Sequence, residues 1–116
     1  MDVCKEAVAV AHEIRECQKL LTAMGDENRQ HLLIEMMQIE DCRGVRVGEI
    51  TKRTNLSRPA VSHHLQILKD AGLIDMRKEG TKNFYYFDSD MKSMKKLIHA
   101  LQRAVNLASQ LPDRSE

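Results

Sequence analysis

Aromatic residues and proline are scarce in this sequence. Only 3% of the 116 residues are aromatic, none is Trp, and two are Pro. A core with so few rings must be aliphatic and rich in methionine, as the cores of helical proteins often are. No run approaches the ~18 apolar residues that span a membrane, and the start Met-Asp-Val-Cys-Lys-Glu does not resemble a signal peptide. We expect a single domain without a membrane segment.

Cysteine is equally scarce and shows no pairing pattern. Cys4, Cys17 and Cys42 are odd in number and include no CxxC spacing. Without an export signal, they are expected to be reduced thiols in a cytoplasmic protein rather than a disulfide framework. The sequence also has no Gly-rich phosphate loop, no nucleophile elbow and no obvious pair of carboxylates, so it does not suggest an enzyme.

The net charge of +1 says nothing by itself about a polyanionic partner, but the distribution of charge does. Residues 1–42 hold four Lys or Arg against nine Asp or Glu, whereas residues 43–82 hold nine against four. Residues 83–116 are close to neutral, with five against four. A basic middle third on an acidic body favours a protein with one face that meets a polyanion.

The segment Leu56–Gly72 has the clearest helix signals in the chain. Ser57 can cap the first turn, Pro59 lies where a helix tolerates proline, and Gly72 can adopt the left-handed conformation that ends a helix. Apolar spacings of four, three and four predict one buried stripe. This stripe consists of Val61, Leu65, Leu68 and Gly72.

The opposite face of this predicted helix is polar and suits a DNA major groove. It carries Pro59, Ser62, His63, Gln66 and Asp70, flanked by Arg58 and Lys69. Short polar side chains can hydrogen-bond base edges while the flanking cations meet phosphates. An ordinary amphipathic helix with a solvated face would show the same pattern, so the neighbouring segments must decide between the two.

The preceding segments complete a helix-turn-helix. Asp26 predicts the start of a helix over residues 27–38, and a short helix is expected over Val47–Thr54. The tight corner Asn55-Leu56-Ser57 then leads into the central helix, so residues 47–72 form the motif. The buried face of the helix over residues 27–38 is predicted to comprise Leu32, Leu33, Met36 and Met37.

The segment that follows predicts a β-hairpin with a basic tip. After Gly72 the apolar spacing changes from 3.6 to 2, with strands at residues 73–77 and 84–87 and a turn at 78–83. The cations near the tip are Arg77, Lys78 and Lys82. A basic hairpin directly after a helix-turn-helix is the wing of a winged-helix domain, so residues 73–87 are expected to contact phosphates or the minor groove.

Two longer helices bracket this winged core. Residues 1–24 carry an apolar heptad from Val3 to Met24 with Cys17 on its buried seam, and residues 89–110 carry a similar stripe after an Asp88-Ser89 cap. Because the core is too small to cover both stripes, we expect these helices to pack across the two-fold axis of a homodimer. Such a dimer would select an inverted-repeat site on double-stranded DNA. The expected fold class is therefore mainly α with a small β-hairpin, a winged helix-turn-helix.

Several of these segments resemble the arsenic-repressor (ArsR/SmtB-type) family of bacterial winged-helix regulators. The resemblance lies in the sequence Met-Gly-Asp-Glu-Asn-Arg at residues 24–29, in Leu-Ser-Arg-Pro-Ala-Val-Ser-His-His-Leu at 56–65, in Leu-Lys-Asp-Ala-Gly-Leu-Ile at 68–74 and in the Tyr85-Tyr86 end of the hairpin. It runs from about residue 20 to residue 103. It implies a dimeric repressor whose operator affinity falls when an inducer binds; the inducer is not identified.

The metal sites best known in that family look absent. Arsenic and lead sensors carry Cys-x-Cys where this chain has Arg46-Val47-Gly48. Zinc sensors carry four ligands on the last helix, whose matching positions here are Asp90, Lys92, Arg103 and Asn106. Only Asp90 is of ligand type, and two cations would repel a bound dication. Neither a metal nor another cofactor is expected.

The candidate DNA contacts are thus Ser57, Arg58, Pro59, Ser62, His63, Gln66, Lys69, Arg77, Lys78 and Lys82. His64, near the buried edge of the central helix, is expected to pack inside. Cys42 lies beside Arg43, which can favour the thiolate, so it is the best candidate for a thiol sensor, although an incidental surface thiol fits as well. The alternative to a DNA-binding repressor is a winged-helix module whose basic face meets an acidic protein.

Overall fold

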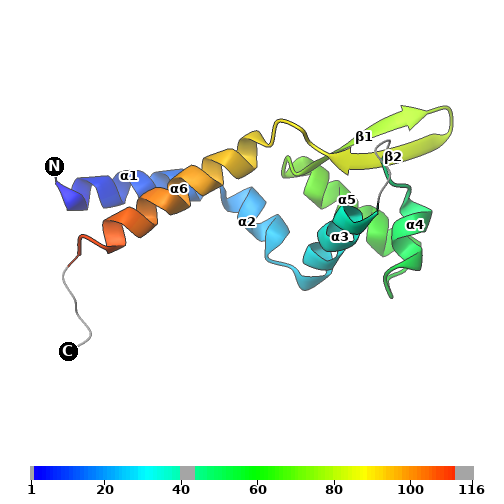
Figure 1. Ribbon diagram of the computed structural model, residues 1–116, viewed down its shortest axis with the longest axis horizontal. Coiled ribbons are helices and arrows are strands. Elements are labelled where there is room, and N and C mark those ends of the chain that lie inside the picture. Colours follow the sequence, from blue (N-terminus) through cyan, green and yellow to red (C-terminus); the bar gives the residue numbers. More distant parts are fainter. Residues whose placement is uncertain (1, 40–43, 112–116) are drawn as a thin grey trace.

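The computed structural model describes residues 2–39 and 44–111 and is mainly helical with one hairpin (Figure 1). Its elements, in chain order, are α1 (Val3–Glu16), α2 (Gln18–Met24), α3 (Glu27–Gln38), α4 (Val47–Lys52), α5 (Arg58–Asp70), β1 (Ile74–Glu79), β2 (Lys82–Phe87) and α6 (Lys92–Ala108). The order of helices and strands is the one predicted, except that two helices stand where one was expected over residues 3–24, and the fold class is confirmed.

A head formed by α2 to α5 and the hairpin holds the apolar core. The buried stripe of α5 is confirmed at Val61, Leu65 and Leu68, which are fully buried, whereas its fourth predicted member, Gly72, is half-buried. They pack in one cluster with residues from the neighbouring elements, including Leu32, Ile50, Leu73, Ile74 and Tyr85. Met37 of α3 was expected in this core but is 71% exposed, since Leu32, Leu33 and Met36 already fill the face of α3 that meets α5.

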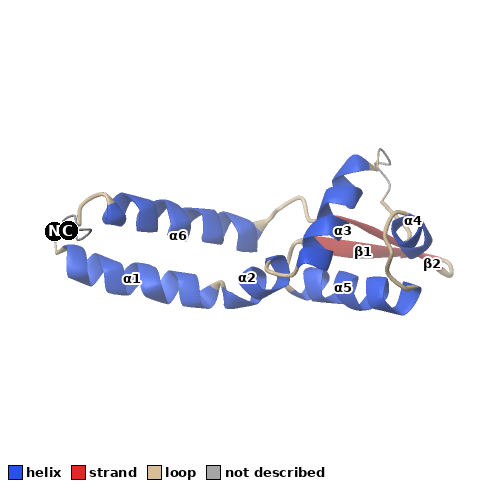
Figure 2. Ribbon diagram, turned by 90° about the horizontal axis from the view of Figure 1, so that it is seen from below, coloured by secondary structure: helices blue, strands red, loops and turns tan. Residues whose placement is uncertain are grey.

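An arm of two antiparallel helices, α1 and α6, projects from the head (Figure 2). Two ion pairs join these helices, Arg103 with Glu13 and Lys96 with Glu16. The molecule measures 56 × 29 × 23 Å with a radius of gyration of 18.0 Å. A compact domain of this length would have a radius of gyration of about 13 Å. The arm therefore has solvent on most of its surface in a single chain.

The single helix expected over residues 3–24 is wrong, because the chain breaks at Cys17. Its backbone leaves the helical region at φ −95° and ψ 8°, and its amide donates to Ile14 O instead of continuing the helix. The heptad seam is continuous, but its two parts meet different partners: α1 packs on α6, whereas α2 packs on α3 and α5. Cys17 itself is buried, as expected.

The predicted start of the last helix is also wrong. The helix begins at Lys92, after Met91 adopts a left-handed conformation with φ 52°. Asp88 accepts a hydrogen bond from the amide of Asp90, so it closes a local turn instead of capping a helix. The short helix α4 likewise ends at Lys52, two residues before the expected end.

The hairpin is longer and its turn tighter than expected. Ile74 pairs with Phe87 and Glu79 with Lys82, which leaves a two-residue turn at Gly80-Thr81, where Gly80 has φ 62°. A third short segment joins the edge of β2, because Val45 and Tyr85 exchange two backbone hydrogen bonds of 2.7 and 2.8 Å. This bridge fixes the hairpin to the chain just before α4.

Candidate DNA-binding surface

The two ends of α5 are fixed by the residues that predicted them. The Ser57 hydroxyl accepts a hydrogen bond from the Ala60 amide at 3.3 Å, and Pro59 lies in the first turn. At the other end Gly72 has φ 83°, and a Cβ there would lie 2.9 Å from the Ser93 hydroxyl. Because both boundaries are set locally, α5 presents one defined face outward.

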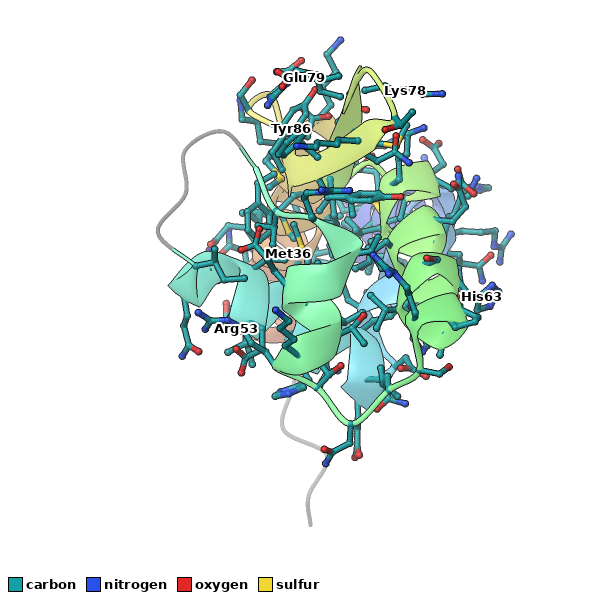
Figure 3. The ribbon with its side chains drawn as sticks, turned by 90° about the vertical axis from the view of Figure 1, so that its right-hand side faces the viewer. Met36, Arg53, His63, Lys78, Glu79 and Tyr86 are labelled. Atoms are coloured by element: carbon teal, nitrogen blue, oxygen red, sulfur yellow. The ribbon has the colours of Figure 1, made fainter. Side chains whose placement is uncertain are left out.

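That outward face carries the predicted base-reading residues. Ser62, His63 and Gln66 are exposed, and Figure 3 shows His63 directed away from the body of the protein. The Gln66 amide donates to the Asp70 carboxylate at 2.9 Å, which holds the Gln66 side chain along the helix. The remaining predicted contacts on α5 and its cap, Ser57, Arg58 and Pro59, are exposed, and Lys69 is half-buried.

The three hairpin cations do not share one face. Neighbouring residues of a strand point to opposite sides, so Arg77 and Lys78 lie on different faces. Figure 3 shows Lys78 on the side of His63. Arg77 pairs with Glu79 at 2.9 Å and places its guanidinium 5.2 Å from the Phe84 ring centre.

Lys82 lies on the same face of the hairpin as Arg77. It is the backbone partner of Glu79 on the opposite strand, and Glu79 is two residues from Arg77, so the three side chains share one face. Of the three cations, only Lys78 therefore continues the outward face of α5. Arg77 and Lys82 could contact DNA only around the tip of the hairpin.

A hollow of about 250 Å³ lies between α4, α5 and the hairpin turn. Its lining includes Arg46, Arg58, Ser62, Thr81 and Asn83. Arg58 rests against α4, where a Cβ added at Gly48 would lie 3.4 Å from an Arg58 amino nitrogen. Two guanidinium groups among short polar side chains form a site suited to a backbone phosphate.

The sequence did not single out Arg46, Thr81 or Asn83 as DNA contacts. The one available signal was the basic block at residues 43–82, which contains Arg46. That block could not show which of its cations share a face, because the hollow is assembled from three separate segments of the chain.

Arg29 holds α5 to the helices before it. Its guanidinium donates to the carbonyl oxygens of Ala23 at 2.7 Å and Thr22 at 3.1 Å, and lies 3.3 Å from His64 Nδ1. Burial lowers the pKa of His64, Asp26 raises it, and the charges of Arg29 and His63 lower it further. A neutral His64 can accept this hydrogen bond. His64, which was expected to pack inside, is half-buried, next to the exposed His63.

The other candidate residues are placed as follows. Cys42 lies outside the described residues, and of the remaining thiols Cys17 is buried and Cys4 exposed. Asp90 lies near Lys92 and Lys95, at 3.6 and 3.9 Å. Within residues 2–39 and 44–111, no three His, Cys, Asp or Glu side chains are grouped to hold a metal ion. No helix in the same ranges is long and apolar enough to cross a membrane.

Comparison with known sequences identifies the family. The model of the bacterial regulatory protein arsR family matches residues 36–76. An uncharacterized HTH-type transcriptional regulator of Methanocaldococcus jannaschii is 37% identical over 84 residues, which cover 72% of this chain and 91% of that protein. The transcriptional activator HlyU of Vibrio cholerae is 38% identical over 88 residues, which cover 75% of this chain and 78% of HlyU.

Solved structures agree with this assignment. HlyU from Vibrio cholerae superposes with a TM-score of 0.53 at 37% identity, covering 72% of this chain and 87% of that one. An ArsR-like transcriptional regulator from Rhodococcus shares the fold, with a TM-score of 0.68 at 23% identity over 84% of this chain and 86% of that one. The chain therefore belongs to the ArsR family of winged helix-turn-helix proteins and is a DNA-binding transcriptional regulator.

Proposed function

We propose that this protein is a cytoplasmic homodimeric repressor that binds an inverted-repeat operator through α5. The observation that carries the proposal is the continuity of the polar face of α5 with the hollow that holds Arg46 and Arg58. Ser62, His63 and Gln66 would meet base edges in the major groove, and the two arginines a phosphate beside it. Lys78 would follow the backbone from the hairpin. Occupancy of the operator would block transcription until an inducer lowers the affinity.

The arm supports the dimer. On α6 the inner stripe, with Leu97, Ala100 and Leu107, is buried within the chain. A second stripe at Ile98, Leu101 and Val105 is 57%, 45% and 64% exposed. So regular an apolar stripe on a helix is rarely left exposed to solvent, because burying it is favourable. A second copy related by a two-fold axis would cover it and would set two α5 helices about 34–36 Å apart, one turn of DNA.

The repressor and the protein-binding module predict different behaviour with DNA. Duplexes selected from a random pool by the purified protein should contain an inverted repeat and should bind at least about a thousandfold more tightly than scrambled duplexes. The logarithm of the affinity should fall linearly with the logarithm of salt concentration. Equal affinity for all duplexes, or no binding at low salt, would contradict operator binding and favour the module.

We also propose Cys42 as the thiol through which an oxidant or persulfide releases DNA. The proposal rests on the sequence, because Arg43 follows it directly and an adjacent cation favours the thiolate. Treatment of the operator complex with a persulfide donor should release the wild type but not Cys42→Ser, whereas Cys4→Ser should respond like the wild type. Equal release of all three proteins would eliminate Cys42 as the sensor.

A further inference from the structure

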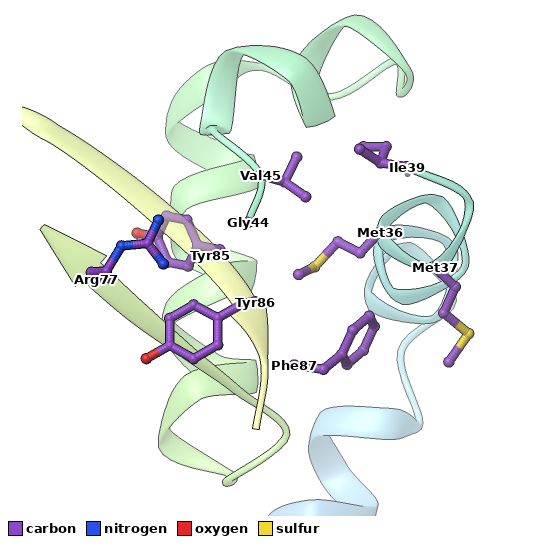
Figure 4. Close-up of a pocket in the computed structure, with 9 residues that line it drawn as sticks. All are labelled: Met36, Met37, Ile39, Gly44, Val45, Arg77, Tyr85, Tyr86 and Phe87. Atoms are coloured by element: carbon purple, nitrogen blue, oxygen red, sulfur yellow. The ribbon is translucent and has the colours of Figure 1, made fainter. Parts of the chain in front are cut away.

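A cavity of about 520 Å³ lies between the end of α3 and the hairpin (Figure 4). Ligand sites for small molecules usually fall between about 300 and 1,000 Å³. The lining comes from three segments of the chain: Met36, Met37 and Ile39, then Gly44 and Val45, then Arg77, Tyr85, Tyr86 and Phe87. The proposed DNA contacts do not need this cavity, apart from Arg77 at its edge.

The floor of this α3–hairpin cavity is held by backbone contacts. Val45 and Tyr85 are buried and joined by their two backbone hydrogen bonds. Gly44 has φ 110°, and a Cβ there would lie 2.9 Å from the Tyr85 carbonyl oxygen, so only glycine permits this close approach. These contacts hold the floor formed by Gly44, Val45 and Tyr85 in place, so a ligand would lose little free energy in ordering that floor.

The two sides of the cavity differ in chemistry. In Figure 4, Met36, Met37 and Phe87 lie on one side, and the Arg77 guanidinium and the Tyr86 hydroxyl lie on the other. Thioethers make favourable contacts with aromatic rings. Met37 is 71% exposed at the rim, an apolar surface that a ligand would cover.

Arg77 carries the formal charge among the described lining residues. Its ion pair with Glu79 joins two partly exposed side chains, and such exposed pairs contribute little to stability. The guanidinium fork matches a carboxylate. A ligand with an aromatic ring and a carboxylate would match both sides of the cavity. Its ring would lie among the methionines and Phe87, and its carboxylate would meet Arg77.

We propose that the α3–hairpin cavity binds a small aromatic carboxylate. Its ring would lie between Met36, Met37 and Phe87, and its carboxylate would meet Arg77 and the Tyr86 hydroxyl. The inference goes beyond the proposed function, because it requires neither DNA nor a dimer. A ligand there would touch β2, the strand that also carries the hairpin turn.

Two features of the sequence make this proposal directly testable with 2-naphthoate as the probe. Both tyrosines of the chain, Tyr85 and Tyr86, line the cavity, and there is no Trp, so the whole tyrosine fluorescence arises there. The chain also has seven methionines, of which Met36 and Met37 line the cavity. In the full-length protein labelled at methionine methyl groups, naphthoate should quench tyrosine emission and shift the Met36 and Met37 signals while leaving Met94 unmoved.

The carboxylate is tested by a charge-matched pair of variants. Arg77→Gln should weaken naphthoate binding at least about tenfold and leave binding of uncharged 2-naphthalenemethanol unchanged. Lys78→Gln removes the neighbouring cation on the opposite face of the hairpin and should bind naphthoate like the wild type. No saturable quenching by millimolar naphthoate, shifts spread over all methionines, or equal losses in the two variants would overturn the proposal. These readouts contain no DNA, so they stay informative even if operator binding fails.

Discussion

Replacing Arg46 tests the hollow between α4, α5 and the hairpin. Each phosphate contact contributes about 0.9 to the slope of log affinity against log salt for duplex DNA. A dimer would place one Arg46 on each half-site, so Arg46→Ala should reduce the slope by about 1.8. At 0.1 M salt this change in slope corresponds to a roughly sixtyfold loss of affinity for the operator. The figure is an upper estimate, because water and other cations partly replace the lost contact.

The assay is a fluorescence anisotropy titration of a labelled operator between 50 and 300 mM salt. Arg53→Ala is the matched control, because Arg53 belongs to the same basic block but lies 3.5 Å from Glu35, on the side of the head away from His63 (Figure 3). It should leave the slope within about 0.3 of the wild type. Equal slopes for Arg46→Ala and the wild type, or equal changes in both variants, would refute the assignment of the hollow to phosphate.

Three other predictions follow from α5 and from the arm. Gln66→Ala should relax the preference at one base pair in each half-site by about 1–3 kcal/mol, measured on single-substitution operators, whereas a uniform loss on all sequences would show that Gln66 meets no base. Because the pKa of His64 is lowered in the folded protein, His64 takes up a proton more readily in the unfolded chain than in the folded one. The free energy of unfolding should therefore fall as the pH drops below the unfolded pKa of about 6.5. Thermal midpoints at pH 7.5 and 5.5 should therefore differ more in the wild type than in His64→Asn, and equal differences would refute this. Ile98→Glu should place two like charges in the dimer interface and give a monomer by sedimentation, while His99→Glu, an exposed position about 100° around α6 from Ile98, should stay dimeric. A dimer that survives Ile98→Glu unchanged would move the interface elsewhere.

The sequence predicted α5 closely because its boundaries depend on local chemistry. Ser57, Pro59 and Gly72 act on the backbone within one turn of their own positions, and the apolar stripe needs only the helical period. The outward placement of Ser62 and His63 then follows from the same period. The identity of the family followed from this segment and its neighbours.

Features that depend on packing between distant segments could not be predicted from the sequence. The break at Cys17 interrupts a continuous heptad, and its cause is that α1 and α2 pack on different parts of the fold. The placement of Arg77 and Lys78 on opposite faces of the hairpin depends on the two-residue turn, because this turn leaves Lys78 within the strand. The polar residues around Gly80 did not indicate so short a turn. The hollow at Arg46 exists only once three segments have met.

Photo-crosslinking from position 63 tests the central claim most directly. p-Benzoylphenylalanine would replace His63 in one protein and Arg53 in another, each bound to the selected operator. Operator binding through α5 predicts crosslinks from position 63 at two symmetry-related sites in the major groove, about 10–10.5 base pairs apart, and none from position 53. Bound protein that gives no crosslinks from position 63, or equal yields from both positions, would contradict it.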